Sequence, residues 1–175
     1  MFECNGFHID VLKKEDAKTL STLMVANIEN FERYMPKTLN ANLTVAESES
    51  FIVEMNSEEI QKNLRLYAIK EGKEVAGLVY IKNLYFDKKE GEFAYCIGAD
   101  FSGKGWITEA ITKLSSYAFE TLSLQSLKII THRTNLGSIR IAEKCGFIWQ
   151  KSLRNEFKPK NEKALDMELY VLERK

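Results

Sequence analysis

The chain has 175 residues, long enough to bury a substantial core, and its 45% hydrophobic and 29% charged residues argue against extended disorder. Its 25 basic and 25 acidic residues balance, which gives no support to a general nucleic-acid or membrane-surface binder. No apolar run is long enough to span a bilayer, and the N-terminus does not resemble a signal peptide. Three widely separated cysteines, Cys4, Cys96 and Cys145, fit reduced thiols in a cytoplasmic protein, and no Cys/His cluster has metal-ligand spacing.

The first third of the chain predicts one strand and two helices. Residues 7–12 alternate apolar and polar side chains and predict a strand. Residues 14–31 have apolar side chains near one helical face, whereas residues 34–43, with Pro36 and two asparagines, read as a loop. Thr44 and Glu47 form a capping-box pattern before a second predicted helix over 48–61.

The middle and end of the chain alternate strands with helices. Apolar runs over 64–72 and 73–86, broken at Glu71-Gly72-Lys73, predict a hairpin, and 92–98 predicts a third strand. The next predicted element is a helix whose apolar stripe is Ile107, Ala110, Ile111, Leu114, Ala118 and Leu122. It is followed by a predicted strand over 126–132 and by a helix over 134–147 that Gly146 ends. Two strands, over 147–157 and 164–172, complete the chain. This order predicts an α/β protein with a mixed sheet, and without a linker or repeat we expect one domain over 1–175.

The stretch ADFSGKG, residues 99–105, places Gly103 and Gly105 around Lys104 just before the long helix. A P-loop is disfavoured because Gly105, and not Ser or Thr, follows Lys104. A dinucleotide fingerprint is disfavoured because Thr108 stands where its third glycine belongs. Two readings remain: an anion site at the start of a helix, or a tight turn that only caps it.

The strand, glycine loop and helix over 92–114 resemble the cofactor segment of the GNAT N-acetyltransferase superfamily. The signature of Gln or Arg, two residues, Gly, one residue and Gly or Ala falls on Asp100, Gly103 and Gly105, with Asp100 as a departure. A second motif appears as Asn135, Ser138 and EKCGF. The opening HIDVLKKEDAKTL and FERYMP is similar to the branch that acetylates ribosomal-protein N-termini. The resemblance implies a mixed, mostly antiparallel sheet of about seven strands flanked by about four helices.

The same resemblance implies acetyl-CoA as cosubstrate, with no metal. Backbone N–H groups of residues 103–108 would hold its pyrophosphate, and Lys104 could add positive charge where Asp100 does not. The implied cofactor-binding residues are Ile97, Gly103, Lys104, Gly105, Trp106, Thr108 and Asn135. Asn135 could bind the pantetheine arm or cap a helix, and a backbone N–H near Ile97 could hold the oxyanion.

Two residues are implied in catalysis. Glu92 would be the general base on the amine, because its strand neighbours are apolar and burial would favour proton uptake; the alternative is a solvated carboxylate like Glu90. Ser138 would protonate the leaving thiolate; the alternative is an ordinary polar residue early in a helix. A thiol route through Cys96 is disfavoured, because buried cysteines usually pack as small apolar groups.

The sequence therefore predicts a cytoplasmic N-acetyltransferase in which an amine attacks acetyl-CoA directly. An α-amino group, with a pKa near ~8, is more often neutral at pH 7 than a lysine amine near ~10.4, which suits a protein N-terminus such as that of a ribosomal protein. The alternatives are a small amine (a polyamine, amino acid or antibiotic) and a non-catalytic acyl-CoA-binding module. Segments 31–43 and 155–163 are the expected acceptor loops, and no direct nucleic-acid or membrane contact is expected.

Overall fold

The computed structural model describes residues 1–159 and 163–174. The chain divides into two compact units, one formed by Met1–Tyr80 and Tyr95–Trp106 and the other by Ile81–Ala94 and Ile107–Lys175. The boundary falls within two strands, β4 (Glu74–Tyr85) and β5 (Glu90–Ile97), so each strand has residues in both units. The hydrogen-bonded strand order is β1-β2-β3-β4-β5-β6-β8-β7.

The first unit begins with a short antiparallel ribbon. Strand β1 (Phe2–Glu3) pairs with β2 (His8–Asp10), which pairs in turn with β3 (Arg65–Glu71). Strands β3 and β4 form the predicted hairpin, whose turn contains Gly72 with a φ of +58°. Strand β1 was not predicted, because two residues are too few to show an alternating pattern.

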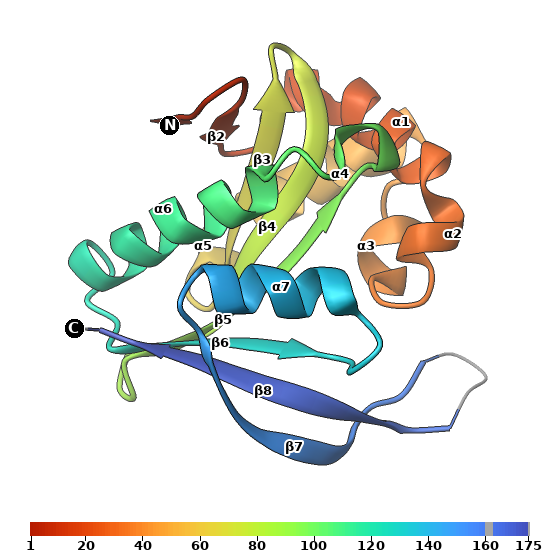
Figure 1. Ribbon diagram of the computed structural model, residues 1–175. Helices are drawn as coiled ribbons and strands as arrows, with labels where there is room; N and C mark the ends of the chain where they lie inside the picture. Colours follow the sequence, from red (N-terminus) through yellow and green to blue (C-terminus); the bar gives the residue numbers. More distant parts are fainter. Residues whose placement is uncertain (160–162, 175) are drawn as a thin grey trace. The chain divides into compact units, whose positions relative to one another are not determined.

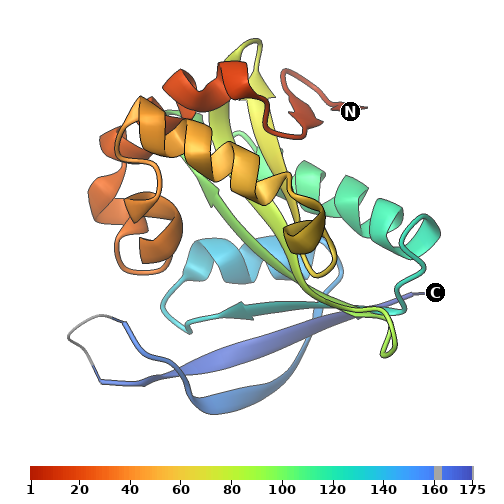
Figure 2. The same cartoon turned by 180° about the vertical axis from the view of Figure 1, so that it is seen from behind.

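Six helices of this unit lie in the segment between β2 and β3. They are the 3₁₀ helix η1 (Lys14–Asp16), α1 (Ala17–Ala26), α2 (Ile28–Phe31), α3 (Pro36–Asn40), α4 (Val45–Met55) and α5 (Glu58–Gln61). In Figure 2, α4 lies across β3 and the first part of β4, with α1 beside it. A buried ion pair between Asp16 Oδ2 and Lys70 Nζ, 2.6 Å apart, attaches η1 to β3.

Three sequence predictions in this region need correction, and one is confirmed. The helix expected over 48–61 divides at Asn56 and Ser57 into α4 and α5. The helix expected over 14–31 breaks at Asn27, whose side chain accepts the Ala99 N–H and donates to Leu23 O, each at 2.9 Å. The expected loop over 34–43 contains α3, which has Pro36 in its first turn, where proline fits a helix well. The capping box is present: Thr44 Oγ1 accepts the Glu47 N–H and Glu47 Oε2 accepts the Thr44 N–H.

The second unit contains the mixed part of the sheet. Strand β5 is parallel to β6 (Ser126–Thr131), and β8 (Leu165–Glu173) is antiparallel to both β6 and β7 (Ile148–Phe157). Helix α6 (Trp106–Glu120) buries most of its predicted stripe, namely Ile107, Ala110, Ile111, Leu114 and Ala118. Helix α7 (Leu136–Lys144) runs alongside β6 in Figure 1 and ends before Gly146, which has the expected positive φ of +83°.

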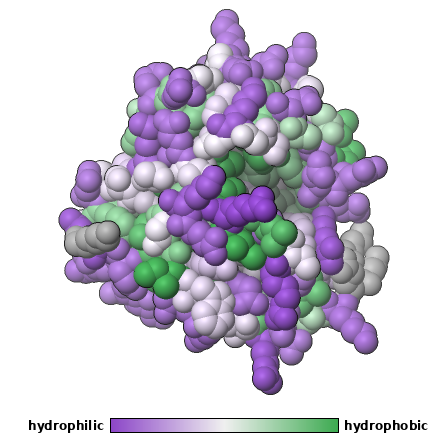
Figure 3. All heavy atoms as spheres, in the orientation of Figure 1, coloured by the Kyte–Doolittle hydropathy of each residue, from purple (hydrophilic) through white to green (hydrophobic). Residues whose placement is uncertain are grey.

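The predicted α/β fold with a mixed, mostly antiparallel sheet is confirmed. The described residues contain eight strands where about seven were expected, and seven α-helices where about four were expected. The added helices are short pieces, α2, α3 and α5. In Figure 3 the visible face is mostly hydrophilic, with hydrophobic side chains in small groups. Within residues 1–159 and 163–174, no helix has the length and apolar character needed to cross a membrane.

Candidate active site

The glycine loop precedes α6 and follows the 3₁₀ helix η2 (Ala99–Phe101). Gly103 and Gly105 have φ angles of +78° and +80°, a conformation that side-chain-bearing residues adopt only at a cost. A Cβ built at either position would meet nothing within 4 Å. The backbone conformation, and not crowding by the protein, therefore explains glycine here, and open space remains beside the loop. Because the first N–H groups of α6 have no acceptor within the helix, the loop fits an anion such as a pyrophosphate.

The Lys104 side chain contacts other residues of the first unit. Its Nζ lies 3.3 Å from Glu71 Oε1 and over the rings of Trp106 and Phe101, at 4.5 and 5.2 Å from their centroids. The Glu71–Lys104 pair is exposed, and such pairs hold weakly, so Lys104 can exchange Glu71 for a stronger anion. Trp106 is only 7% exposed and stacks on Phe7 at 5.1 Å, so its ring serves packing and only its backbone can face a cofactor.

Ile97, at the end of β5, lies where the backbone of β5 comes close to Gly77 on β4. A Cβ at Gly77 would lie 2.5 Å from Cys96 O and 3.2 Å from Ile97 Cα, so only glycine fits opposite these residues. One residue further along, the Gly98 N–H donates to Ala76 O at 2.8 Å. The backbone around Ile97 is thus held firmly, as a preorganised oxyanion donor requires.

Thr108 lies in the first turn of α6, in the second unit. Its carbonyl oxygen accepts the Thr112 hydroxyl at 2.9 Å and the Cys145 thiol at 3.4 Å. These bonds attach the residue after α7 to the start of α6. Burial raises the pKa of the Cys145 thiol, which agrees with a packing role for this cysteine.

Asn135 caps α7. Its Oδ1 accepts the Ser138 N–H at 3.1 Å, so the capping alternative for Asn135 is confirmed. The cap uses the side-chain oxygen, while a role toward pantetheine would fall to the amide nitrogen. Ser138 therefore stands in the first turn of α7, directly bound to the cap.

Glu92 lies on β5 with a side chain that is 13% exposed, and both of its oxygens are bound. Lys82 Nζ lies 2.8 Å from Oε1, and Asn83 Nδ2 donates to Oε2 at 2.9 Å. The expectation of an apolar environment is therefore wrong: the strand neighbours are apolar, but β4 supplies a cation and an amide. These partners orient the carboxylate.

The catalytic candidates of the second unit lie on opposite faces of its sheet. Phe93 meets Phe147, which follows α7, with ring centroids 6.3 Å apart, so Phe93 points to the α7 side. Adjacent strand residues point to opposite faces, which places Glu92 on the other side, opposite Lys128 in register. Glu92 and Ser138 are thus not neighbours on one face of the sheet.

Two sets of polar side-chain contacts were not predicted from the sequence. The Thr38 and Tyr80 hydroxyls lie 3.0 Å apart and join α3 to β4. Glu168 on β8 binds Trp149, Ser152 and Arg133. In both, the partners are far apart in sequence and have no spacing rule to reveal them.

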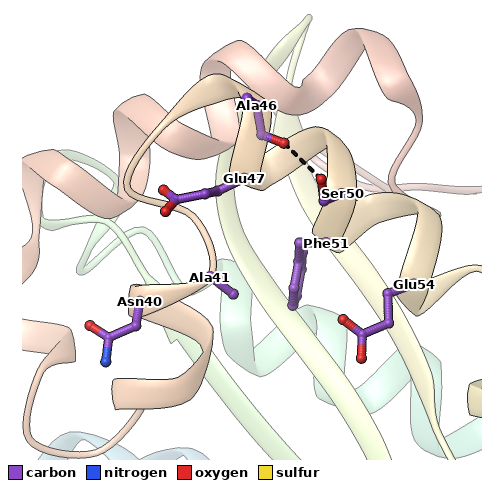
Figure 4. Close-up of a pocket in the computed structure, with 7 residues that line it drawn as sticks. All are labelled: Asn40, Ala41, Ala46, Glu47, Ser50, Phe51 and Glu54. Carbon is purple, nitrogen blue, oxygen red and sulfur yellow. Dashed lines mark hydrogen bonds between the residues drawn. The ribbon is translucent and has the colours of Figure 1, made fainter.

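The first unit has a surface hollow of about 450 Å³, and Figure 4 shows the residues that line it. Phe51 points into it from α4, and the carboxylates of Glu47 and Glu54 lie on either side of the ring. Asn40 and Ala41 complete one wall, so part of the expected acceptor segment 31–43 lines it. None of the sequence-predicted site residues does. The other expected acceptor segment, 155–163, includes 160–162, which lie outside the described residues.

Comparison with known proteins gives concordant matches. The family model described as "Acetyltransferase (GNAT) domain" matches residues 8–148. YdaF of Bacillus subtilis (strain 168), provisionally named a ribosomal N-acetyltransferase, is 27% identical over 158 residues, which cover 89% of this chain and 86% of YdaF. The spermidine N(1)-acetyltransferase of Escherichia coli (strain K12) is 31% identical over 93 residues, covering 53% of this chain and 50% of that protein.

A solved structure supports the fold over nearly the whole chain. The microcin C7 self-immunity acetyltransferase MccE, crystallised with acetyl-CoA and AMP, aligns with a TM-score of 0.86 at 24% identity, covering 98% of this chain and 94% of MccE.

Proposed function

Because this chain belongs to the GNAT family of N-acetyltransferases, which use acetyl-CoA, we propose that its acceptor is the N-terminal amine of a protein such as a ribosomal protein. The observation that carries this choice is the extent of the likeness to YdaF, which spans 89% of the chain, whereas the likeness to the spermidine enzyme spans 53%. The chain would work as one domain over residues 1–175, in the cytoplasm.

In this proposal the glycine loop binds acetyl-CoA. Backbone N–H groups of Gly103, Lys104, Gly105, Trp106 and Thr108 hold the pyrophosphate, supported by the open space beside the two left-handed glycines and by the start of α6. Lys104 adds charge after leaving Glu71. Asn135 binds the pantetheine arm through its amide nitrogen while its oxygen caps α7.

The chemistry is a direct transfer. The neutral amine nitrogen forms a bond to the acetyl carbonyl carbon, the carbon–sulfur bond breaks, and the amine loses one proton. Glu92, on the other face of the sheet from Ser138, takes that proton through water, and Ser138 returns one to the departing thiolate. The backbone N–H near Ile97 stabilises the carbonyl oxygen as negative charge develops on it.

A second acceptor class, small amines such as spermidine, is favoured by two observations. The spermidine enzyme is 31% identical over its matched half, a higher identity than YdaF shows over its longer match. The hollow beside α3 also carries two carboxylates, which would suit a cationic acceptor.

The discriminating experiment is a comparison of kcat/KM across acceptors at fixed acetyl-CoA. The panel contains peptides copied from ribosomal-protein N-termini, the same peptides with blocked α-amines, spermidine and an aminoglycoside. We expect a free-amine peptide to give the highest kcat/KM and its blocked form to give none. A higher value for spermidine would replace the protein N-terminus with a polyamine, and turnover of none of them would favour the acyl-CoA-binding alternative.

A further inference from the structure

The carboxylate of Glu168 lies beside the end of β6, where the connection to α7 begins. Glu168 on β8 is directly opposite Thr131, the last residue of β6, in the antiparallel register. Glu168 is only 9% exposed. A charged side chain is rarely buried to this extent unless it is paired, so its partners indicate what it does.

The Glu168 carboxylate holds three donors. Its Oε2 accepts the Trp149 indole N–H and the Ser152 hydroxyl, each at 2.8 Å, and its Oε1 lies 3.5 Å from an Arg133 guanidinium nitrogen. The Trp149 and Ser152 hydrogen bonds hold the pKa of Glu168 below its ordinary value, against the opposing effect of burial. The two β7 donors thus fix the orientation of an ionised carboxylate, whose other oxygen faces Arg133.

Arg133 belongs to the connection of residues 132–135, which carries the cap of α7. Within it the Asn135 N–H donates to His132 O at 2.8 Å, and His132 Nδ1 lies 2.7 Å from Thr134 Oγ1. Asn135 Oδ1 then accepts the Ser138 N–H. Glu168 is therefore linked to the first turn of α7 by the Arg133 ion pair, the backbone of residues 133–135 and the Asn135–Ser138 hydrogen bond.

We propose that Glu168 is a positioning residue for the transfer reaction: through Arg133 it fixes the β6–α7 connection and so sets where Asn135 and Ser138 stand. The proposal rests on the proposed function in one respect, that Asn135 and Ser138 act on the thioester. Glu168 itself touches no reacting atom.

If Glu168 only stabilised the fold, its replacement would lower Tm and leave kcat unchanged. Strands β7 and β8 are already paired along most of their length, so the hairpin does not depend on one side chain. Arg133 is 58% exposed, and ion pairs with exposed partners contribute little to stability. Misplacing a catalytic group by about 1 Å can nevertheless cost on the order of 10²-fold in rate.

The test compares Glu168→Gln, Arg133→Ala, the double variant and Arg133→Lys. The matched control is Glu173→Gln, an exposed carboxylate on the same strand opposite Ser126. Each variant is scored for kcat, for acceptor KM, for Tm and for the Tm increase that acetyl-CoA produces. We expect Glu168→Gln and Arg133→Ala each to lower kcat about 10- to 100-fold while retaining the acetyl-CoA-induced increase. Arg133→Lys should recover part of the loss.

The double variant should be no slower than the slower single variant, since both changes release the same connection. The control should match the wild type. Independent, multiplying losses would overturn the proposal, as would a normal kcat for Glu168→Gln below its Tm.

Adding Ser138→Ala separates this proposal from the proposed role of Ser138. If Ser138→Ala alone leaves kcat unchanged, the proton transfer by Ser138 is wrong, and the Arg133–Glu168 comparison still decides the positioning role. If Ser138→Ala is slow and Glu168→Gln is not, the positioning role is wrong and the proposed function stands.

Discussion

Gly103 and Gly105 adopt a left-handed backbone that costs other residues about 1–2 kcal/mol. Gly105→Glu should add that strain and also place a carboxylate at the proposed pyrophosphate site. We expect it to abolish the rise in Tm that acetyl-CoA causes in the wild type by mass action. Gly72→Glu is the matched control, because Gly72 has a φ of +58° and also nothing within 4 Å of its Cβ position. Equal acetyl-CoA-induced shifts in the two variants would contradict the loop assignment.

Cys96 is buried, and burial raises the pKa of its thiol to about 12. Below that pH the thiol stays protonated and cannot serve as a nucleophile. We therefore expect Cys96→Ala to keep kcat within about threefold of the wild type, since the proposed direct transfer forms no acyl-enzyme. In native protein, alkylation followed by mass spectrometry should label Cys4 and Cys145 well before Cys96. A trapped acetyl group on Cys96 would overturn direct transfer.

Glu92 and Glu90 offer a matched pair on one strand, because each carboxylate binds a lysine, Lys82 and Lys128 respectively. If Glu92 is the base, Glu92→Gln should lower kcat/KM on the order of 10²-fold at pH 7. The loss should shrink as pH approaches the pKa of the acceptor amine, which then arrives neutral. Glu90→Gln removes a comparable ion pair and should leave the pH–rate profile unchanged. Coincident profiles for Glu92→Gln and the wild type would exclude Glu92 as the base.

Helix α3 is joined to β4 by the buried hydroxyl of Tyr80, which lies 3.0 Å from that of Thr38. Tyr80→Phe keeps the ring and removes this one bond, at a cost of about 1 kcal/mol in the free energy of unfolding. Because α3 lies in the expected acceptor segment, we expect acceptor KM to rise several-fold, with the KM for acetyl-CoA unchanged. Steady-state kinetics with each substrate varied in turn measures both. An increase confined to the KM for acetyl-CoA would contradict the assignment of α3 to the acceptor.

At the scale of the elements, local chemistry made several features predictable. The Thr44–Glu47 capping box, the hairpin turn at Gly72 and the end of α7 before Gly146 each depend on residues close in sequence. The break at Asn27 was missed because its cause is a bond to Ala99, 72 positions away. Helix α3 was missed because Pro36, like the two asparagines, was interpreted as a loop signal, although proline also fits the first turn of a helix.

The same contrast between features set by neighbouring residues and features set by distant residues applies to the candidate site. The left-handed glycines before α6 and the cap at Asn135 are each encoded by contiguous residues, so these two structural features could be predicted from the sequence. The environment of Glu92 was misjudged because Lys82 and Asn83 reach it across β4 and β5. The Glu168 grouping joins residues from the β6–α7 connection, β7 and β8, and only the register of the folded sheet brings them together.

For the molecule as a whole, the central claim is that an acetyl group passes from acetyl-CoA to the α-amino group of a polypeptide. The most direct measurement uses an unblocked ribosomal-protein N-terminal polypeptide that also contains internal lysines, incubated with enzyme and acetyl-CoA. Fragmentation by mass spectrometry then locates each acetyl group. We predict one acetyl group per chain, on the α-nitrogen, with its formation lost in Gly105→Glu and retained in Gly72→Glu. Acetylation of lysines instead, or of spermidine alone in a mixture with the polypeptide, would contradict the account.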